Sequence, residues 1–222
     1  MRILIFGGSG TIGSACHDLA IGLGHEVIVA SRSAIKENFF HLNQDLDNLQ
    51  QISEPFDAII WAQGSNTNDT IDKSDDFEEI MAANITFIRN SFRILYQSEL
   101  LKKPARLVLI GSIWQNLSRE NKFSYSVSKS AMLGMVGSLS ADFSGEEIIT
   151  NAVLPGIIMS PMTEKNLTLE QIAKVKSQTP TKSLVSLGEL ARIIIWLASP
   201  DSSGIAGQSI TVDNGWSKFR EI

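Results

Sequence analysis

The chain has 222 residues, of which 43% are hydrophobic and 19% are charged, and its formal net charge is −5. A chain of this length most often forms one domain, and this apolar fraction is enough for a sizeable core. The mildly acidic balance argues against the basic surface by which proteins hold a nucleic-acid backbone. The single cysteine, Cys16, cannot form a disulfide within the chain, so we expect a reducing compartment, the cytoplasm.

The sequence offers no segment suited to secretion, to a membrane or to a metal. Four apolar residues precede the first glycine, too few for the core of a signal peptide. No apolar run approaches the roughly 18 residues that a membrane helix needs. The three histidines have no second ligand at metal spacing. We therefore expect a cytoplasmic protein with no membrane, nucleic-acid or metal partner.

Short apolar runs alternate with longer stretches of helical spacing along the chain. The runs suit strands that are buried on both faces, and they cover residues 3–6, 27–30, 58–62, 107–110, 151–154 and 209–212. The clearest helical patterns cover residues 77–101, 124–143 and 187–197. This alternation predicts a single α/β domain, residues 1–222, built on a doubly wound parallel sheet.

Two connections depart from this alternation. Residues 31–57 leave room for only short helices between the second and third predicted strands. Residues 155–187 are rich in Thr, Ser, Lys and Pro and contain one short helical candidate, 169–175. A long irregular segment in a compact domain is usually a functional lid or a mobile loop. Residues 156–187 are therefore predicted to form the substrate-binding loop.

A glycine-rich turn follows the first predicted strand and leads into a helical pattern that we expect from Ser14. Glycines let backbone amides approach a pyrophosphate closely, and the helix N-terminus behind them favours the anion. Glycines also serve plain turns, but the strand–turn–helix context favours a dinucleotide site. The predicted contacts in this turn are Gly7, Ser9, Gly10, Thr11, Ile12 and Gly13.

The end of the second predicted strand favours one dinucleotide over the other. NAD-binding folds often place a carboxylate there to hold the ribose hydroxyls, but this strand ends in Ser31 and Arg32. Serine leaves room for a 2′-phosphate, and the planar arginine fork can pair with it. These residues predict NADPH rather than NADH, the alternative being that Arg32 is an ordinary solvated cation.

Tyr125 and Lys129, four residues apart, would share one face of the helix predicted at 124–143. An ammonium beside a phenol favours the phenolate, so we expect the pKa of Tyr125 to fall toward neutral pH. Ser112 follows the strand at 107–110, where it is placed to hydrogen-bond a substrate carbonyl oxygen. Asn84 is an uncharged polar residue among apolar neighbours on the preceding predicted helix.

These residues and spacings resemble the short-chain dehydrogenase/reductase family, whose active tetrad is a Tyr-x-x-x-Lys pair, a serine thirteen residues upstream and a more distant asparagine. The resemblance covers essentially the whole chain and implies a Rossmann fold of three α/β/α layers. It implies that Tyr125 donates a proton to the developing alkoxide while Ser112 holds that oxygen. Lys129 would lower the pKa of the tyrosine and bind the nicotinamide ribose, and Asn84 would hold a water that links Lys129 to solvent.

The same resemblance extends the cofactor site beyond the glycine turn. Residues 154–162 resemble the Pro-Gly segment that contacts the nicotinamide, and residues 207–215 resemble the closing strand. Residues 61–64 depart from the family's Asn-Asn-Ala-Gly run, because only the glycine is kept. The further contacts that the resemblance implies are Asp45 and Leu46 at the adenine, and Ala62, Gly64, Pro155, Gly156, Ile158 and Ser160.

The resemblance implies an NADPH-dependent oxidoreductase that reduces a ketone or aldehyde to an alcohol, or runs in reverse. A non-catalytic dinucleotide-binding regulator is one alternative, which the intact Ser112, Tyr125 and Lys129 disfavour. A sugar-nucleotide-modifying enzyme of the extended branch is another, but it would need a larger C-terminal lobe. The partner is a small carbonyl or alcohol molecule, and the family usually forms homodimers or homotetramers. Apolar residues on more than one face of the helices at 77–101 and 124–143 agree with such an assembly.

Three further residues have simpler interpretations. Trp114 falls where the pocket of the family forms, and it could stack on a substrate or shield the site. Tyr96 has no lysine four residues later, so we interpret it as a packing residue. Cys16 is predicted to be a small buried hydrophobe.

Overall fold

A computed structural model describes residues 1–32, 39–73 and 76–219, apart from the side chains of residues 162, 165 and 166. Seven parallel strands form one sheet in the order β3-β2-β1-β4-β5-β6-β7. The strands are β1 (Arg2–Phe6), β2 (Glu26–Ser31), β3 (Phe39–His41), β4 (Phe56–Trp61), β5 (Leu101–Ile110), β6 (Ile148–Pro155) and β7 (Ser209–Val212). The order reverses between β1 and β4, which makes the sheet doubly wound, as the sequence predicts.

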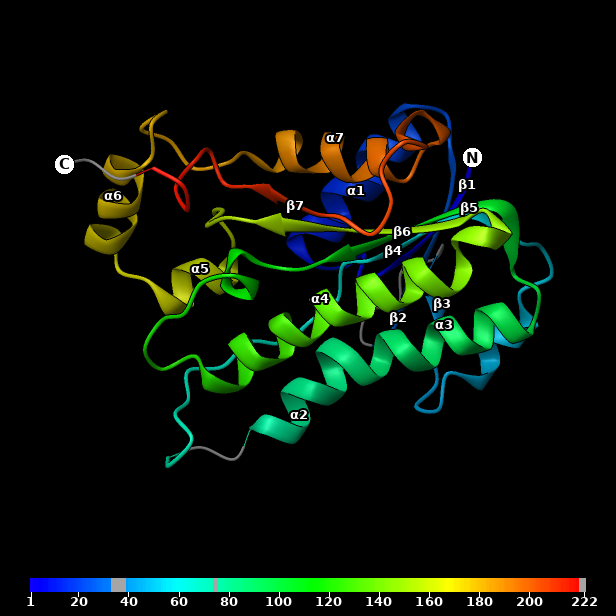
Figure 1. The fold of residues 1–222 in the computed structure, drawn as a ribbon, viewed down its shortest axis with the longest axis horizontal. Coiled ribbons are helices and arrows are strands. Elements are labelled where there is room, and N and C mark those ends of the chain that lie inside the picture. The colour runs from blue at the N-terminus through cyan, green and yellow to red at the C-terminus, as the bar shows by residue number, and fades with distance from the viewer. Residues whose placement is uncertain (33–38, 74–75, 220–222) are drawn as a thin grey trace.

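Helices cover both faces of the sheet (Figure 1). On one face lie α1 (Thr11–Gly22) and α7 (Leu187–Leu197), and on the other lie α3 (Phe87–Gln97) and α4 (Phe123–Phe143). The short helix α2 (Phe77–Met81) precedes α3, while α5 (Pro161–Asn166) and α6 (Leu169–Gln178) lie beyond the ends of β6 and β7. Successive β1 side chains alternate between the two cores, because neighbouring strand residues point to opposite faces.

Several elements begin or end elsewhere than the sequence predicts. Helix α1 begins at Thr11 rather than Ser14, because Gly10 already provides the extended residue that precedes a helix. The helical pattern expected to run to residue 101 ends at Gln97, since Leu101 pairs with Phe56 and begins β5. The short strand β3 was not predicted. The predicted loop at 156–187 contains α5 and α6.

The connection from residue 31 to residue 57 contains one 3₁₀ turn, Asp47–Gln51, in keeping with the short helices expected there. Residues 33–38 of this connection lie outside the described residues.

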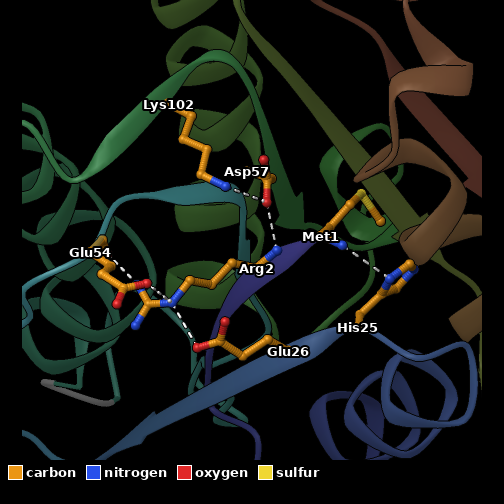
Figure 2. A network of polar contacts seen from close by, with 7 residues as sticks. All are labelled: Met1, Arg2, His25, Glu26, Glu54, Asp57 and Lys102. Atoms are coloured by element: carbon orange, nitrogen blue, oxygen red, sulfur yellow. Dashed lines mark hydrogen bonds and ion pairs between the residues drawn. The ribbon is translucent and has the colours of Figure 1, made fainter.

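The amino-terminal edge of the sheet is held by polar contacts that join four strands (Figure 2). Arg2 on β1 donates from Nε to Glu26 Oε1 on β2 at 2.7 Å, and its guanidinium also donates to the backbone oxygen of Glu54. The backbone N–H of Arg2 donates to Asp57 Oδ2 on β4 at 2.6 Å, and Lys102 on β5 donates to the same oxygen at 3.0 Å. Partial burial tends to raise the pKa of Asp57, but the hydrogen bonds from Arg2 and Lys102 lower it by more, so the pKa is lowered overall. These contacts therefore stabilise the sheet at the amino-terminal ends of its strands. A functional site is expected at the opposite, carboxyl-terminal ends.

Candidate active site

A cavity of about 450 Å³ lies at the carboxyl ends of the strands. Its walls come from the segments that follow β1, β2, β4, β5 and β6, together with the start of α4. In doubly wound sheets, ligands bind outside the carboxyl ends of the strands, at the point where the strand order reverses. The position of the cavity is therefore the one that the topology favours for a ligand.

Most of the residues predicted from the sequence line this cavity. They are Gly7, Ser9, Gly10, Thr11, Ile12, Ser31, Arg32, Ala62, Gly64, Ser112, Tyr125, Pro155, Gly156, Ile158 and Ser160. The predicted residues that are not part of its wall are Gly13, Asp45, Leu46, Asn84 and Lys129.

The glycine turn has a shape that side chains would destroy. Gly7 has φ +77°, and a Cβ there would lie 2.5 Å from the backbone nitrogen of Gln63. A Cβ on Gly13 would lie 2.3 Å from the Gly7 oxygen, so Gly13 shapes the turn from behind the wall. Helix α1 starts at the cavity with no side-chain cap and no acid in its first turn. A bare helix N-terminus behind such a turn fits a pyrophosphate.

Gln63 is a cavity residue that the sequence analysis did not select. Both polar atoms of its side-chain amide are buried and have no hydrogen-bond partner among the described residues. A buried amide without partners is costly, so the environment of Gln63 suits a polar ligand. The available signal was its position in residues 61–64, where the chain departs from the family pattern.

Ser31 and Arg32 stand together at the end of β2, on the cavity wall. Ser31 is buried, whereas the Arg32 side chain is exposed and its guanidinium carbon lies 5.4 Å from the centroid of the Phe87 ring. An exposed guanidinium beside a small serine can accommodate a phosphate group.

The residues expected at the adenine lie further away. Leu46 is buried in the core with φ 62°, and Asp45 is exposed, so neither belongs to the cavity wall. Leu42, on the same connection, does line the cavity. The adenine contact of Asp45 and Leu46 stays a prediction.

Ser112, two residues after β5, and Tyr125, in the first turn of α4, both line the cavity, and the Ser112 hydroxyl is close enough to Tyr125 to influence its pKa. Burial raises the pKa of Tyr125, and the nearby Ser112 hydroxyl only partly opposes the rise. The expectation that the pKa of Tyr125 is lowered was therefore wrong for the protein without ligands. Burial penalises the phenolate more than its neighbours favour it.

Lys129 lies buried beneath this pair. Its Nζ donates to the backbone oxygen of Ile110 at 2.9 Å and lies 5.7 Å from the centroid of the Tyr125 ring. Burial lowers the pKa of Lys129 to about 8. No acid forms an ion pair with it in the described part of the chain. Lys129 is therefore a buried amine that can change its protonation state near neutral pH.

Asn84 is fully buried in a π-helical turn, residues 82–86, between α2 and α3. Its Oδ1 accepts from the backbone N–H of Ser65 at 2.8 Å, and its Nδ2 donates to the Ser65 oxygen at 3.0 Å and to Ser128 Oγ at 2.9 Å. Such turns are frequent at functional sites. Through these hydrogen bonds, Asn84 connects the segment after β4 to α4. Its role in holding a water stays a prediction.

The remaining predicted positions have clear surroundings. The Trp114 ring lines the cavity and packs edge-to-face on Trp216, with 6.0 Å between the centroids. Tyr96 packs against Phe143, as predicted, and its hydroxyl also donates to Glu146 Oε1 at 2.9 Å. Cys16 is buried, also as predicted, and burial raises the pKa of its thiol to about 12.

Neither a membrane span nor a metal cluster is found within residues 1–32, 39–73 and 76–219. No helix there is both long and apolar enough to cross a bilayer. No group of three or more His, Cys, Asp or Glu side chains there is arranged to hold a metal ion.

The doubly wound sheet, the glycine turn and the Ser112, Tyr125 and Lys129 cluster define the class of this protein as an α/β oxidoreductase. A family model described as "Enoyl-(Acyl carrier protein) reductase" matches residues 14–217. The chain therefore belongs to the short-chain dehydrogenase/reductase family, as the resemblance of its motifs implied.

Relatives with assigned names are similar over most of the chain. The 3-oxoacyl-(acyl-carrier-protein) reductase FabG of Buchnera aphidicola is 30% identical over 193 residues, which cover 82% of this chain and 79% of that protein. The 3-oxoacyl-(acyl-carrier-protein) reductase MabA of Mycobacterium bovis is 29% identical over 230 residues, which cover 96% of this chain and 91% of that protein.

Solved structures share the fold. A short-chain dehydrogenase family protein from Francisella tularensis superposes with a TM-score of 0.87 at 25% identity, covering 97% of this chain and 98% of that one. The aldohexose dehydrogenase of Thermoplasma acidophilum gives a TM-score of 0.88 at 20% identity, covering 100% of this chain and 95% of that one. The second likeness is one of fold alone.

Proposed function

We propose that this protein uses NADPH to reduce the carbonyl group of a small molecule to an alcohol, a reaction that is reversible. The observation that carries the proposal is that Ser112 and Tyr125 meet at the cavity wall, with the Lys129 amine buried near the Tyr125 ring. Two converging hydroxyls can hold one oxygen and give it a proton. The curated relatives, named as 3-oxoacyl reductases, support a ketone as the reacting group.

The glycine turn, Ser31 and Arg32 would hold NADPH, which supplies the hydride. Pro155, Gly156 and Ile158 would line its nicotinamide end, and Ser160 would contribute a hydroxyl there. The unpartnered amide of Gln63 adds a donor and an acceptor to the same wall.

The protein's own groups then move the proton. Tyr125 donates its hydroxyl proton to the carbonyl oxygen as that oxygen becomes an alkoxide, and Ser112 donates a hydrogen bond to the same oxygen. The raised pKa of Tyr125 keeps the phenol protonated at neutral pH, as an acid in the direction of reduction requires. Lys129 stabilises the phenolate left behind and would bind the nicotinamide ribose. Asn84 would hold the water that links Lys129 to solvent.

The loop at 156–187 provides substrate specificity within a single domain, residues 1–222. Ile158, Ser160, Thr163 and Leu167 line the cavity, which supports this assignment. The enzyme works in the cytoplasm as a homodimer or homotetramer, in keeping with its family. Two of the apolar residues on α3, Phe87 and Ile94, are respectively buried and half-buried in the subunit, so other positions on α3 and α4 would form the interface.

Reduction of a carbon–carbon double bond is a second candidate, because the matching family model is described as an enoyl reductase. In that reaction, hydride adds to the β carbon of the unsaturated compound and a proton ends on the α carbon, so no carbonyl oxygen becomes an alcohol. The convergence of Ser112 and Tyr125 on one oxygen favours carbonyl reduction.

We expect purified protein to consume NADPH with 3-oxoacyl thioesters, ketones or aldehydes and not with the matching 2-enoyl thioesters. Loss of the reduced-nicotinamide absorbance band, with identification of the alcohol, measures this. Turnover of the enoyl compounds alone would replace the proposal by the second candidate. Tight NADPH binding without turnover of any compound would indicate a regulator.

Exchanging Arg32 for Gln should weaken the binding of NADPH about 10- to 100-fold, because a charge-assisted hydrogen bond to phosphate is lost. The affinity for NADH should be unchanged, and Arg192→Gln on the exposed face of α7 serves as the matched control. Fluorescence titration of each nucleotide gives the dissociation constants. Equal affinities of the wild-type protein for NADPH and NADH would contradict the assignment.

A further inference from the structure

Two cations that the proposed mechanism does not use are part of the cavity wall. Lys122 and Arg119 both line the cavity wall beside Tyr125. Lys122 comes directly before α4 and is only 3% exposed, and its Nζ lies 5.7 Å from the centroid of the Tyr125 ring. Two buried ammonium groups, those of Lys129 and Lys122, therefore lie near the Tyr125 ring.

Neutral oxygens are the partners of the Lys122 ammonium. Its Nζ donates to Asn66 Oδ1 at 2.7 Å and to the backbone oxygen of Thr67 at 2.9 Å, which leaves one of three hydrogens. The acid whose charge favours the ammonium is Asp69, but its two carboxylate oxygens accept from the backbone N–H and the hydroxyl of Ser124. Lys122 thus has no ion-pair partner within the described ranges.

Positive charge exceeds negative charge around Lys122. Burial lowers the pKa of Lys122 to about 8, the positive charge of Arg119 lowers it too, and Asp69 acts in the opposite direction. At pH 7 such a lysine is still mostly charged. Arg119 also has no acidic partner among the residues that the structure describes. Two like charges at one cavity are costly unless a ligand brings an anion between them.

We propose that Lys122 and Arg119 bind an acidic group of the substrate, and that the substrate is an oxo acid whose carboxylate lies a few bonds from the reacting carbonyl. The inference rests on the proposed function and names its substrate class. The proximity of Lys122 to Tyr125 sets the spacing, because the anion must meet one while the carbonyl oxygen meets the other. The phosphate of a carrier-protein arm is separated from its acyl carbonyl by a long chain, so it fits this spacing poorly.

The test compares 2-oxo, 3-oxo and 4-oxo acids with their neutral methyl esters and with a 3-oxoacyl phosphopantetheine thioester. Lys122→Gln, which keeps a hydrogen-bond donor for the 66–67 segment, should lower kcat/KM for the best acid about 10- to 100-fold, mainly through KM. The same variant should change kcat/KM for the ester by about threefold or less. Arg119→Gln should show the same selectivity with a smaller loss, about 3- to 10-fold, because Arg119 is partly exposed. Lys102→Gln, which removes a charge at the amino-terminal ends of the strands (Figure 2), should leave kcat/KM unchanged for both the acid and the ester.

Calorimetric titration of the same acids reads binding without turnover, so the inference can be judged even if no compound is reduced. Binding that Lys122→Gln abolishes supports the anion site, and absence of turnover then counts against the proposed function alone. Equal losses of kcat/KM for acid and ester in the Lys122 and Arg119 variants would overturn the inference. Lys122 would then only hold the 66–67 segment in place through its hydrogen bonds. If the variants lost kcat/KM selectively for the phosphate-bearing thioester, the proposal of a carboxylate a few bonds from the carbonyl would be overturned.

Discussion

Tyr125→Phe is expected to lower kcat about 100- to 10,000-fold, because it removes the hydroxyl that protonates the carbonyl oxygen. The ring is retained, so the packing of α4 at the cavity and the dissociation constant for NADPH should stay nearly unchanged. Steady-state kinetics with the best carbonyl substrate measures the loss, and nucleotide titration measures the binding. Tight NADPH binding without turnover is the expected combination.

The chain supplies a matched control in its other tyrosine. Tyr96 donates a hydrogen bond to Glu146 away from the cavity, so Tyr96→Phe removes an equivalent hydroxyl with no role in proton transfer. Its kcat should stay close to that of the wild-type enzyme. If the Tyr125 variant retained activity comparable to the Tyr96 variant, Tyr125 would not be the acid.

Lys129→Met is expected to have opposite effects on activity and stability. Turnover should fall about 100-fold or more, because the phenolate of Tyr125 loses its nearby cation. The free energy of unfolding at pH 7 should rise by about 1–2 kcal/mol, because a buried ammonium with a pKa near 8 carries a penalty larger than one lost hydrogen bond to Ile110. Denaturant unfolding of the protein without nucleotide measures the second effect.

The stability difference has a defined pH dependence. The folded pKa of Lys129, about 8, lies below the roughly 10.4 of an unfolded lysine, so the unfolded chain holds more protons between these values. Lys129 therefore costs stability in full below pH 8, and the cost disappears as the pH rises toward 10. The advantage of Lys129→Met should shrink over the same interval. An exposed lysine change, Lys174→Met on α6, should show no such trend.

A stability gain that stayed constant from pH 7 to pH 10 would contradict the buried-charge explanation, since loss of charge is what relieves the cost. A loss of stability at pH 7 would mean that the hydrogen bond to Ile110 outweighs the burial of the ammonium.

The fold could be predicted well because its signals are local. Apolar runs of strand length marked six of the seven strands, and only the three-residue β3 lacked such a run. Strand ends were less accurate, because β5 begins where Leu101 meets Phe56 across the sheet, and that pairing leaves no local mark. The π-helical turn that carries Asn84 was likewise invisible, since a helical pattern does not record one inserted residue.

The candidate site divides in a similar way. The positions of Gly7, Ser112 and Tyr125 follow from spacing, because parallel strands bring their carboxyl ends to one edge. The residues that the resemblance added divide into two groups: Pro155, Gly156 and the other predicted nicotinamide contacts line the cavity, whereas Asp45 and Leu46 are not part of its wall and their adenine contact stays a prediction.

By itself, the sequence determined the alternation of six of the strands with helices, the glycine turn and the Tyr-x-x-x-Lys spacing, since each is set by residues close in the chain. Tertiary structure decided what surrounds those residues. The raised pKa of Tyr125, the lowered pKa of Lys129, the unpartnered amide of Gln63 and the burial of Lys122 all depend on segments packed from elsewhere. Desolvation and pairing are properties of a three-dimensional neighbourhood, so no one-dimensional spacing records them.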